Sequence, residues 1–284
     1  MSPQRQWFTE DCDECGTAFR VAVRRLLHEE RSPFQHIQVY ETETLGNLLV
    51  LDGFIMLSSR DNFFYHEMMT HPALYTHPAP RRVLIVGGGD CGCLQECLKH
   101  PGLEQVDQVD IDERVTRVSE RFFPELCTAN DDPRARLHFA DAIEWVARAA
   151  PGQYDVIVID STDPIGQAAR LFSADFYRDC HRALGDHGVL VAQSESPLFH
   201  RELMEAMATR MQAAGFDHTA RLYFPQCVYP SGWWTATLAS RAVAPADFRV
   251  LDAQAKPFPT RYYNAAIHQG ALAEPEFLRA AIPA

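Results

Sequence analysis

Residues 83–90 read Val83-Leu84-Ile85-Val86-Gly87-Gly88-Gly89-Asp90, an apolar run closed by three glycines and a carboxylate. Four apolar residues in succession, without alternation, are typical of a strand buried on both faces. Residues that suit a helix follow over about 91–99. The stretch therefore predicts a strand, a tight turn and a helix.

Four more short stretches that suit strands follow along the chain, separated by stretches that suit helices. The predicted strands are residues 108–111, 136–139, 155–159 and 188–192, and the helical stretches are 113–122, 142–149 and 173–184. Strands that are apolar throughout and alternate with helices are typical of a parallel sheet covered on both faces. We therefore predict a doubly wound α/β domain with the strands in the order 3-2-1-4-5.

A different pattern precedes this domain. Ahead of Asp61, apolar residues alternate with polar ones, and Asp52-Gly53 supplies the strongest short hairpin signal. Asp61 is placed to cap a helix, which we expect Pro72 to interrupt. We predict a small antiparallel β domain at residues 1–60, followed by the α/β domain at 61–284.

The chain of 284 residues carries 26 Lys and Arg against 38 Asp and Glu, a formal net charge of −12. This acidic balance disfavours binding to nucleic acid, whose phosphates attract clusters of Lys and Arg. No apolar run approaches the ~18–20 residues that span a bilayer. The first residues lead into acidic sequence rather than an apolar signal core. We therefore expect a cytoplasmic protein without nucleic-acid or membrane partners.

Cysteine spacing gives no sign of a metal centre. Cys12 and Cys15 form a Cys-x-x-Cys pair without a second well-spaced pair, which disfavours structural zinc. Free thiols are the default in a cytoplasmic protein of this size. We predict that the chain binds no metal and that its cysteines are free thiols.

Acidic residues follow the ends of four predicted strands. They are Asp90, Asp110 with Asp112, Asp141, and Asp160 with Asp163. Ligands of an open doubly wound sheet bind beyond the carboxyl ends of its strands, so Asp90, Asp160 and Asp163 are predicted to surround one cleft. Two of these residues have a structural alternative, Asp141 as a helix cap and Asp163 as a turn residue.

The glycines match a nucleotide-binding turn, but Asp90 changes the ligand that the turn favours. Gly87, Gly89 and Gly92 satisfy G-x-G-x-x-G, and Asp110 follows about 20 residues later. A carboxylate in this turn repels a pyrophosphate by about 4 kcal/mol at a separation of about 4 Å and an effective dielectric constant of about 20. The turn therefore favours a nucleoside with positive charge, such as a sulfonium nucleoside, over a dinucleotide.

Longer motifs resemble one family over nearly the whole chain. The motifs are Gly87-Gly88-Gly89-Asp90, Val109-Asp110-Ile111-Asp112, Asp160-Ser161-Thr162-Asp163-Pro164-Ile165-Gly166, Tyr65-His66-Glu67-Met68, Tyr229-Pro230-Ser231-Gly232 and Arg261-Tyr262-Tyr263-Asn264. They resemble the spermidine synthases, or polyamine aminopropyltransferases. Methyltransferases share the glycine turn but not the Asp-x-x-Asp-Pro-x-Gly and Tyr-His-Glu-Met elements.

The resemblance implies a methyltransferase-like Rossmann domain that is catalytic and follows the small β domain. It implies transfer of the aminopropyl group of decarboxylated S-adenosylmethionine, a co-substrate, to putrescine, giving spermidine and methylthioadenosine. It implies no cofactor and no metal, and the chain is expected to form a homodimer or a homotetramer.

Candidate site residues carry over by position. Those expected at the nucleoside are Gln35, Gly87, Gly89, Asp110, Asp141, Ala142 and Gln167. Those expected at the acceptor amine are Tyr65, His66, Asp90, Asp160, Ser161, Thr162, Asp163 and Tyr229. Asp160 is the expected catalytic residue, as the group that accepts a proton from the attacking amine. Trp7 and Trp233, with Tyr65 and Tyr229, are candidates to enclose the methylene chain, but core packing is the favoured interpretation for Trp233 and for Trp234.

The chain departs from the family at several positions. The family usually has Gly at Cys91, Gln at Met56, Glu at Ser59, Glu at Asp110 and Pro at Gln167. The loss of polar groups at Met56 and Ser59 leaves the acceptor open, with cadaverine, agmatine and spermidine as alternatives to putrescine. A non-catalytic polyamine- or nucleoside-binding protein of the same fold is the main functional alternative, ahead of a methyltransferase and a nicotinamide dehydrogenase.

Overall fold

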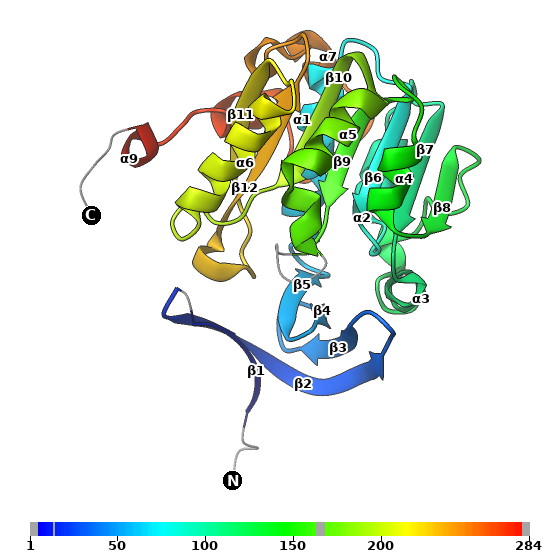
Figure 1. Cartoon of the computed structure of the whole chain (residues 1–284). Helices are drawn as coiled ribbons and strands as arrows, with labels where there is room; N and C mark the ends of the chain where they lie inside the picture. The colour runs from blue at the N-terminus through cyan, green and yellow to red at the C-terminus, as the bar shows by residue number, and fades with distance from the viewer. Residues whose placement is uncertain (1–4, 14, 163–167, 280–284) are drawn as a thin grey trace.

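The computed structural model describes residues 5–13, 15–162 and 168–279, which form two sheets with helices around the second (Figure 1). The first sheet is antiparallel, and its five strands lie in chain order. They are β1 (Gln6–Cys12), β2 (Thr17–Arg31), β3 (His36–Thr42), β4 (Asn47–Leu51) and β5 (Phe54–Ser58). Asp52 and Gly53 join β4 to β5 with φ angles of 50° and 92°, a left-handed backbone that suits glycine. The predicted hairpin is confirmed, whereas β1 was not predicted.

The second sheet has seven strands in the order β11-β12-β10-β9-β6-β7-β8. They are β6 (Arg82–Gly87), β7 (Gln105–Asp110), β8 (Ala135–Phe139), β9 (Tyr154–Asp160), β10 (Leu184–Gln193), β11 (His218–Pro225) and β12 (Trp233–Ser240). The five strands from β8 to β10 pair in parallel, which confirms the predicted doubly wound order. The antiparallel strands β11 and β12, which extend the sheet beyond β10, were not predicted.

Central strands face a buried layer on each side, which explains their uninterrupted apolar runs. In β6, Val83 and Ile85 belong to one buried cluster, and Leu84 and Val86 belong to another. The helices are α1 (Asn62–Thr76), α2 (Gly92–Leu98), α3 (Glu113–Phe122), α4 (Ala142–Arg148), α5 (Ala174–Ala183), α6 (Arg201–Ala213), α7 (Val250–Gln254), α8 (Ala265–Ala271) and α9 (Glu276–Arg279). Within the described ranges, no helix is both long and apolar enough to cross a membrane.

Helix α1 continues through Pro72, so the expected interruption is wrong. Proline removes one backbone N–H from the helix, but nearly every residue of α1 is buried against the rest of the domain, and this packing holds the helix together. The helix ends at Thr76, and His77 is extended because Pro78 follows it. Asp61 precedes the helix but makes no capping bond, since its carboxylate accepts a hydrogen bond from Ser58 Oγ at 2.6 Å instead. The predicted cap is therefore wrong.

Candidate active site

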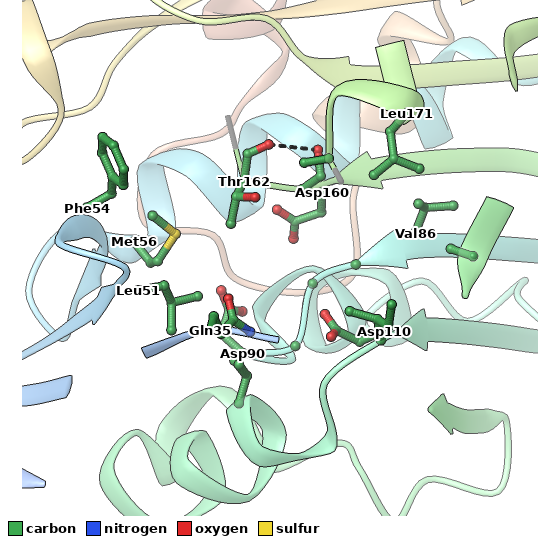
Figure 2. Close-up of a pocket in the computed structure, with 18 of the residues that line it drawn as sticks. Gln35, Leu51, Phe54, Met56, Val86, Asp90, Asp110, Asp160, Thr162 and Leu171 are labelled. Atoms are coloured by element: carbon green, nitrogen blue, oxygen red, sulfur yellow. Dashed lines mark hydrogen bonds between the residues drawn. The ribbon is translucent and has the colours of Figure 1, made fainter. Parts of the chain in front are cut away.

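A cleft of about 470 Å³ lies at the carboxyl ends of the central strands (Figure 2). Every described residue of the predicted site lines this cleft: Gln35, Tyr65, His66, Gly87, Gly89, Asp90, Asp110, Asp141, Ala142, Asp160, Ser161, Thr162 and Tyr229. Asp163 and Gln167 lie outside the described residues. Asp90 and Asp160 come together because they follow the neighbouring strands β6 and β9.

The glycine turn lies directly against the end of β9. Gly87 has a φ angle of 80°, and a Cβ atom on it would come within 2.1 Å of the Asp160 carbonyl oxygen. The Gly88 N–H donates a hydrogen bond to the same oxygen at 2.8 Å. No side chain fits at Gly87, so glycine lets the turn and Asp160 meet through their backbones.

Asp110 lies at one end of the cleft, and Asp112 connects it to the N-terminal sheet. The Asp112 N–H donates to Asp110 Oδ1 at 2.8 Å. Asp112 Oδ2 accepts hydrogen bonds from Gln35 Nε2 at 2.8 Å and from Ser32 Oγ at 2.6 Å. Burial raises the pKa of Asp110 to about 6, although the backbone bond from Asp112 opposes this shift. This end of the cleft presents a carboxylate that can accept hydrogen bonds from hydroxyl groups.

Asp141 fits both of the interpretations given above. Its Oδ1 accepts a hydrogen bond from the Ile143 N–H at 2.8 Å, which makes it the N-cap of α4. It also lines the cleft, as does Ala142, the first residue of this helix. The capping role therefore does not remove Asp141 from the site.

Asp160 is buried with an incomplete set of hydrogen bonds. Its Oδ1 accepts a hydrogen bond from the Tyr65 hydroxyl at 2.8 Å, whereas Oδ2 has no partner among the described residues. Burial, followed by the negative charge of Asp90, raises the pKa of Asp160 to about 6. At neutral pH this side chain is therefore a charged acceptor, and one of its two oxygens, Oδ2, has no donor among the described residues.

His66 and Asp90 form an ion pair in the same cleft. His66 Nε2 lies 3.2 Å from Asp90 Oδ1 and 3.3 Å from Oδ2. Burial lowers the pKa of His66, but the charge of Asp90 and its hydrogen bond outweigh this effect and raise the pKa to about 9. Burial likewise opposes ionisation of Asp90, but the contacts with His66 and the Gly92 N–H hold its pKa below the usual range. The imidazolium therefore offsets one carboxylate of the cleft.

Two of the four aromatic residues expected at the amine line the cleft. Tyr65 and Tyr229 lie with ring centroids 6.0 Å apart, and the Tyr229 hydroxyl donates to the Met56 carbonyl oxygen at 2.6 Å. Trp7 instead lies beneath the Arg20 guanidinium, 4.9 Å from its carbon, and Trp233 packs against other aromatic rings. Trp7 is therefore not at the cleft, and the contacts of the partly buried Trp233 agree with the core packing favoured for it.

Gln226 lines the cleft and was not predicted. It is fully buried, and it follows β11, a strand that the sequence pattern did not reveal. Among the departures from the family, Met56 and Asp110 line the cleft. Cys91 is buried with a φ angle of 68° at the start of α2, where the family has glycine.

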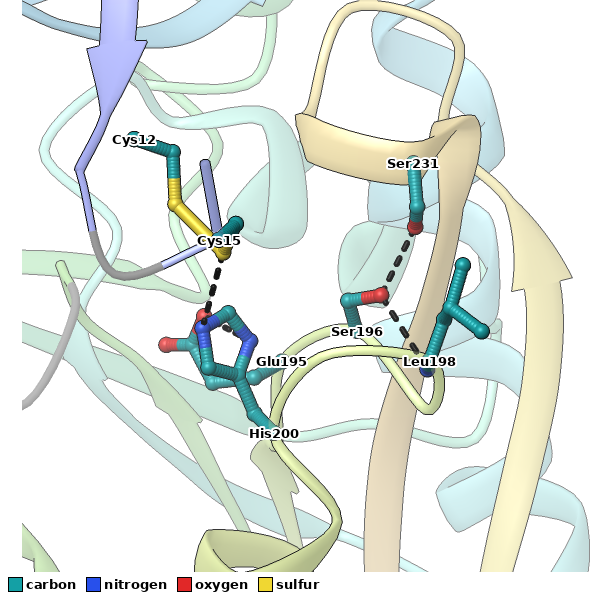
Figure 3. The surroundings of a disulfide bond; sticks show 7 residues. All are labelled: Cys12, Cys15, Glu195, Ser196, Leu198, His200 and Ser231. Carbon is teal, nitrogen blue, oxygen red and sulfur yellow. Dashed lines mark hydrogen bonds and ion pairs between the residues drawn. A yellow bond between two sulfur atoms is a disulfide. The ribbon is translucent and has the colours of Figure 1, made fainter. Parts of the chain in front are cut away.

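Away from the cleft, Cys12 and Cys15 form a disulfide at the turn between β1 and β2 (Figure 3). Cys15 Sγ lies 3.9 Å from His200 Nε2, so this turn meets the segment that follows β10. The expectation of free thiols is therefore wrong for this pair, and it holds for the six other cysteines. In the part of the chain that the structure describes, no group of three or more His, Cys, Asp or Glu residues is placed to hold a metal ion.

Two family models together match most of the chain. Residues 6–59 match the spermidine synthase tetramerisation domain, and residues 62–249 match the spermine/spermidine synthase domain. A polyamine aminopropyltransferase of Nitrosococcus oceani is 61% identical over 273 residues, which cover 96% of this chain and 95% of that protein. Another from Methylococcus capsulatus is 57% identical over 277 residues, covering 98% and 97%.

Solved structures agree with these matches. A spermidine synthase in complex with the transition state analogue AdoDATO has a TM-score of 0.93 at 32% identity, covering 98% of this chain and 96% of that one. Spermidine synthase from Thermotoga maritima has a TM-score of 0.91 at 32% identity, with the same coverage. The predicted fold class and resemblance are confirmed. By its fold and by these comparisons, the chain belongs to the spermine/spermidine synthase family.

Proposed function

We propose that this chain is a polyamine aminopropyltransferase that moves the aminopropyl group of decarboxylated S-adenosylmethionine to putrescine. The products are spermidine and methylthioadenosine. The observation that carries the proposal is the buried Asp160 carboxylate, whose Oδ2 has no donor among the described residues and which lines a cleft together with Asp90 and Asp110. Such a cleft attracts cationic substrates, and both proposed substrates are cations.

The two ends of the cleft suit the two substrates. Asp110 and Gln35 accept and donate hydrogen bonds at the nucleoside, and Asp141 and Ala142 line the same end. Asp90 attracts the ammonium of the aminopropyl group, and in decarboxylated S-adenosylmethionine a hydrogen replaces the carboxylate that stands beside this ammonium in S-adenosylmethionine. Loss of that carboxylate removes the repulsion that Asp90 would otherwise impose.

Asp160 supplies the proton acceptor for the transfer. An amine with a pKa near that of lysine, ~10.4, lacks a lone pair at neutral pH, and presenting it neutral costs about 4–5 kcal/mol. The amine proton passes to Asp160, and the nitrogen forms a bond to the carbon attached to the sulfonium. The carbon–sulfur bond breaks, and its electron pair stays on sulfur to give the neutral thioether. Alignment of nitrogen, carbon and sulfur in the cleft supplies further acceleration.

The tetramerisation domain that matches residues 6–59 supports a homo-oligomer, which we propose to be a dimer or a tetramer. We also propose that the protein acts in the cytoplasm without a cofactor or a metal. The proposed reaction requires no second macromolecule, since both substrates are small molecules.

The test is to incubate the protein with labelled decarboxylated S-adenosylmethionine and one amine at a time. The panel contains putrescine, cadaverine, agmatine and spermidine. Release of methylthioadenosine that depends on putrescine supports the full proposal, and dependence on another amine corrects the acceptor. Binding of both substrates without release of methylthioadenosine would instead identify a non-catalytic binding protein.

A further inference from the structure

The side chain of Gln226 is fully buried, and none of the described residues forms a hydrogen bond with it. Its exposed fraction is 0%, and neither Oε1 nor Nε2 has a partner within the described ranges. Its backbone is held on both sides, because its N–H donates to the Gly232 carbonyl at 3.0 Å and its carbonyl accepts from the Tyr229 N–H at 3.2 Å. The loop therefore fixes an unpaired amide inside the protein.

This amide lines the cleft beside residues whose donors are already used. The Tyr65 hydroxyl donates to Asp160, the Tyr229 hydroxyl donates to the Met56 carbonyl, and Asn62 Nδ2 donates to the Ser58 carbonyl. A buried polar group without a partner costs about 1–3 kcal/mol. A ligand donor in the cleft would remove this cost.

We propose that Gln226 Oε1 accepts a hydrogen bond from the amino group of the acceptor amine that does not attack. This inference rests on the proposed function. Two residues that line the same cleft, Asp160 at the end of β9 and Gln226 in the loop after β11, each hold a buried oxygen without a partner among the described residues, Oδ2 and Oε1 respectively. A diamine has an N–H donor at each end and matches this pair of acceptors. Asp160 takes the attacking end and Gln226 takes the other.

A neutral acceptor at this place also has a consequence for selectivity. The Gln226 carbonyl gives a hydrogen bond without adding another negative charge to a cleft that already holds Asp90, Asp110 and Asp160. Gln226 therefore distinguishes a diamine from a monoamine of the same length by the N–H at the far end. It is a specificity-determining residue for the acceptor.

The experiment compares binding of putrescine and n-butylamine to wild type and Gln226→Leu by isothermal titration calorimetry, with methylthioadenosine present. The two amines share a four-carbon chain, but n-butylamine lacks the second amino group. We expect Gln226→Leu to weaken putrescine binding about tenfold or more and to leave n-butylamine binding within about twofold. Its unfolding temperature without ligand should equal or exceed that of wild type, since leucine removes the unpaired amide.

Matched variants separate this role from a general effect on packing. Gln226→Glu keeps acceptor oxygens and should retain putrescine binding, and it also serves if Gln226→Leu fails to fold. Gln108→Leu replaces another buried glutamine with an unpartnered Oε1, on β7 and outside the lining of the cleft. It should leave the binding of both amines within about twofold.

Equal weakening of both amines, or unchanged putrescine binding in Gln226→Leu, would overturn the inference. Because the readout is binding, it does not depend on turnover. Failure of the wild type to release methylthioadenosine with any amine would count against the proposed function alone.

Discussion

Glu67, on helix α1, and Asp160, which is bonded to Tyr65 of the same helix, are both buried carboxylates, and they differ in how completely they are hydrogen-bonded. Glu67, 1% exposed, accepts three backbone N–H bonds from Arg261, Tyr262 and Tyr263 at 2.7, 2.8 and 2.7 Å. Asp160, 9% exposed, accepts a side-chain bond from Tyr65 and leaves Oδ2 without a described partner. In the sequence both are simply acidic residues, and only the hydrogen bonds around them in the fold distinguish one from the other.

The number of fixed hydrogen-bond donors distinguishes a structural carboxylate from one that is able to bind a ligand. Glu67 holds the C-terminal segment on the back of α1, and its charge is satisfied by fixed donors. The charged form of Asp160 is less well stabilised, because its carboxylate is buried but does not receive a hydrogen bond at both oxygens from the described residues. Removal of charge should therefore have opposite effects at the two positions.

The largest effect is expected from Asp160→Asn. Without a proton acceptor, kcat should fall about 10²–10⁴-fold. The dissociation constant of methylthioadenosine should stay within about threefold, and the unliganded protein should unfold at a higher temperature. Steady-state kinetics, calorimetry and thermal unfolding measure these values, with the exposed Asp186→Asn as the matched control. Equal loss of turnover and nucleoside affinity would contradict the role of Asp160.

Glu67→Gln should lower the stability of the protein and leave its turnover nearly unchanged. The variant places an amide NH₂ against backbone N–H donors, so the free energy of unfolding should fall by about 2–4 kcal/mol. The kcat per folded molecule should stay within about threefold. Urea unfolding checks the first value, and Glu104→Gln, in an exposed ion pair with Arg81, should cost less than about 1 kcal/mol. A Glu67→Gln variant that kept its stability but lost activity would contradict the structural role assigned to Glu67.

His66 adds a pH dependence to the cleft. Its pKa of about 9 exceeds the ordinary value of 6.5, so its pairing with Asp90 stabilises the fold fully below pH 6.5, and this contribution is lost as the pH rises through 9. The difference in unfolding free energy between wild type and His66→Gln should shrink by about 2 kcal/mol from pH 6.5 to pH 9.5. Urea unfolding of both proteins at each pH measures it. A difference that grew with pH would show that the imidazole is neutral in the fold.

The smallest effect is expected at Asp110. Its pKa is raised to about 6 from 3.8, so its contribution to stability is present below pH 3.8 and is lost as the pH rises through 6. Asp110→Asn should therefore be more stable than wild type by about 1 kcal/mol at pH 7.5, after allowance for partial exposure, and this advantage should vanish at pH 4. Thermal unfolding at the two pH values tests this, and an advantage that persisted at pH 4 would assign it to packing instead.

Much of the fold and the cleft could be predicted from short local patterns. The run Val83–Val86 with its glycines marked the first central strand, and acidic residues marked the strand ends that the sheet brings together. The family and the class of enzyme are confirmed by relatives named polyamine aminopropyltransferase. Putrescine as the acceptor and the roles of single residues stay predictions.

The parts that could not be predicted depend on tertiary contacts. The sequence pattern does not predict strand β12, because Thr235, Thr237 and Ser240 are polar yet fully buried. Thr235 and Thr237 satisfy their hydroxyls through Ser194 on the neighbouring chain segment, which no local pattern reveals. Gln226 is notable because its buried amide has no partner in the part of the chain that the structure describes, and that property exists only in the folded molecule.

Asp112 makes the two parts of the chain interdependent. It is buried, it accepts bonds from Ser32 and Gln35 of the N-terminal sheet, and its own N–H positions the carboxylate of Asp110. The N-terminal part of the chain is thereby joined through Asp112 to a carboxylate that lines the cleft of the second sheet. A variant that lost the hydrogen bonds of Ser32 and Gln35 would leave the place of Asp110 less firmly fixed.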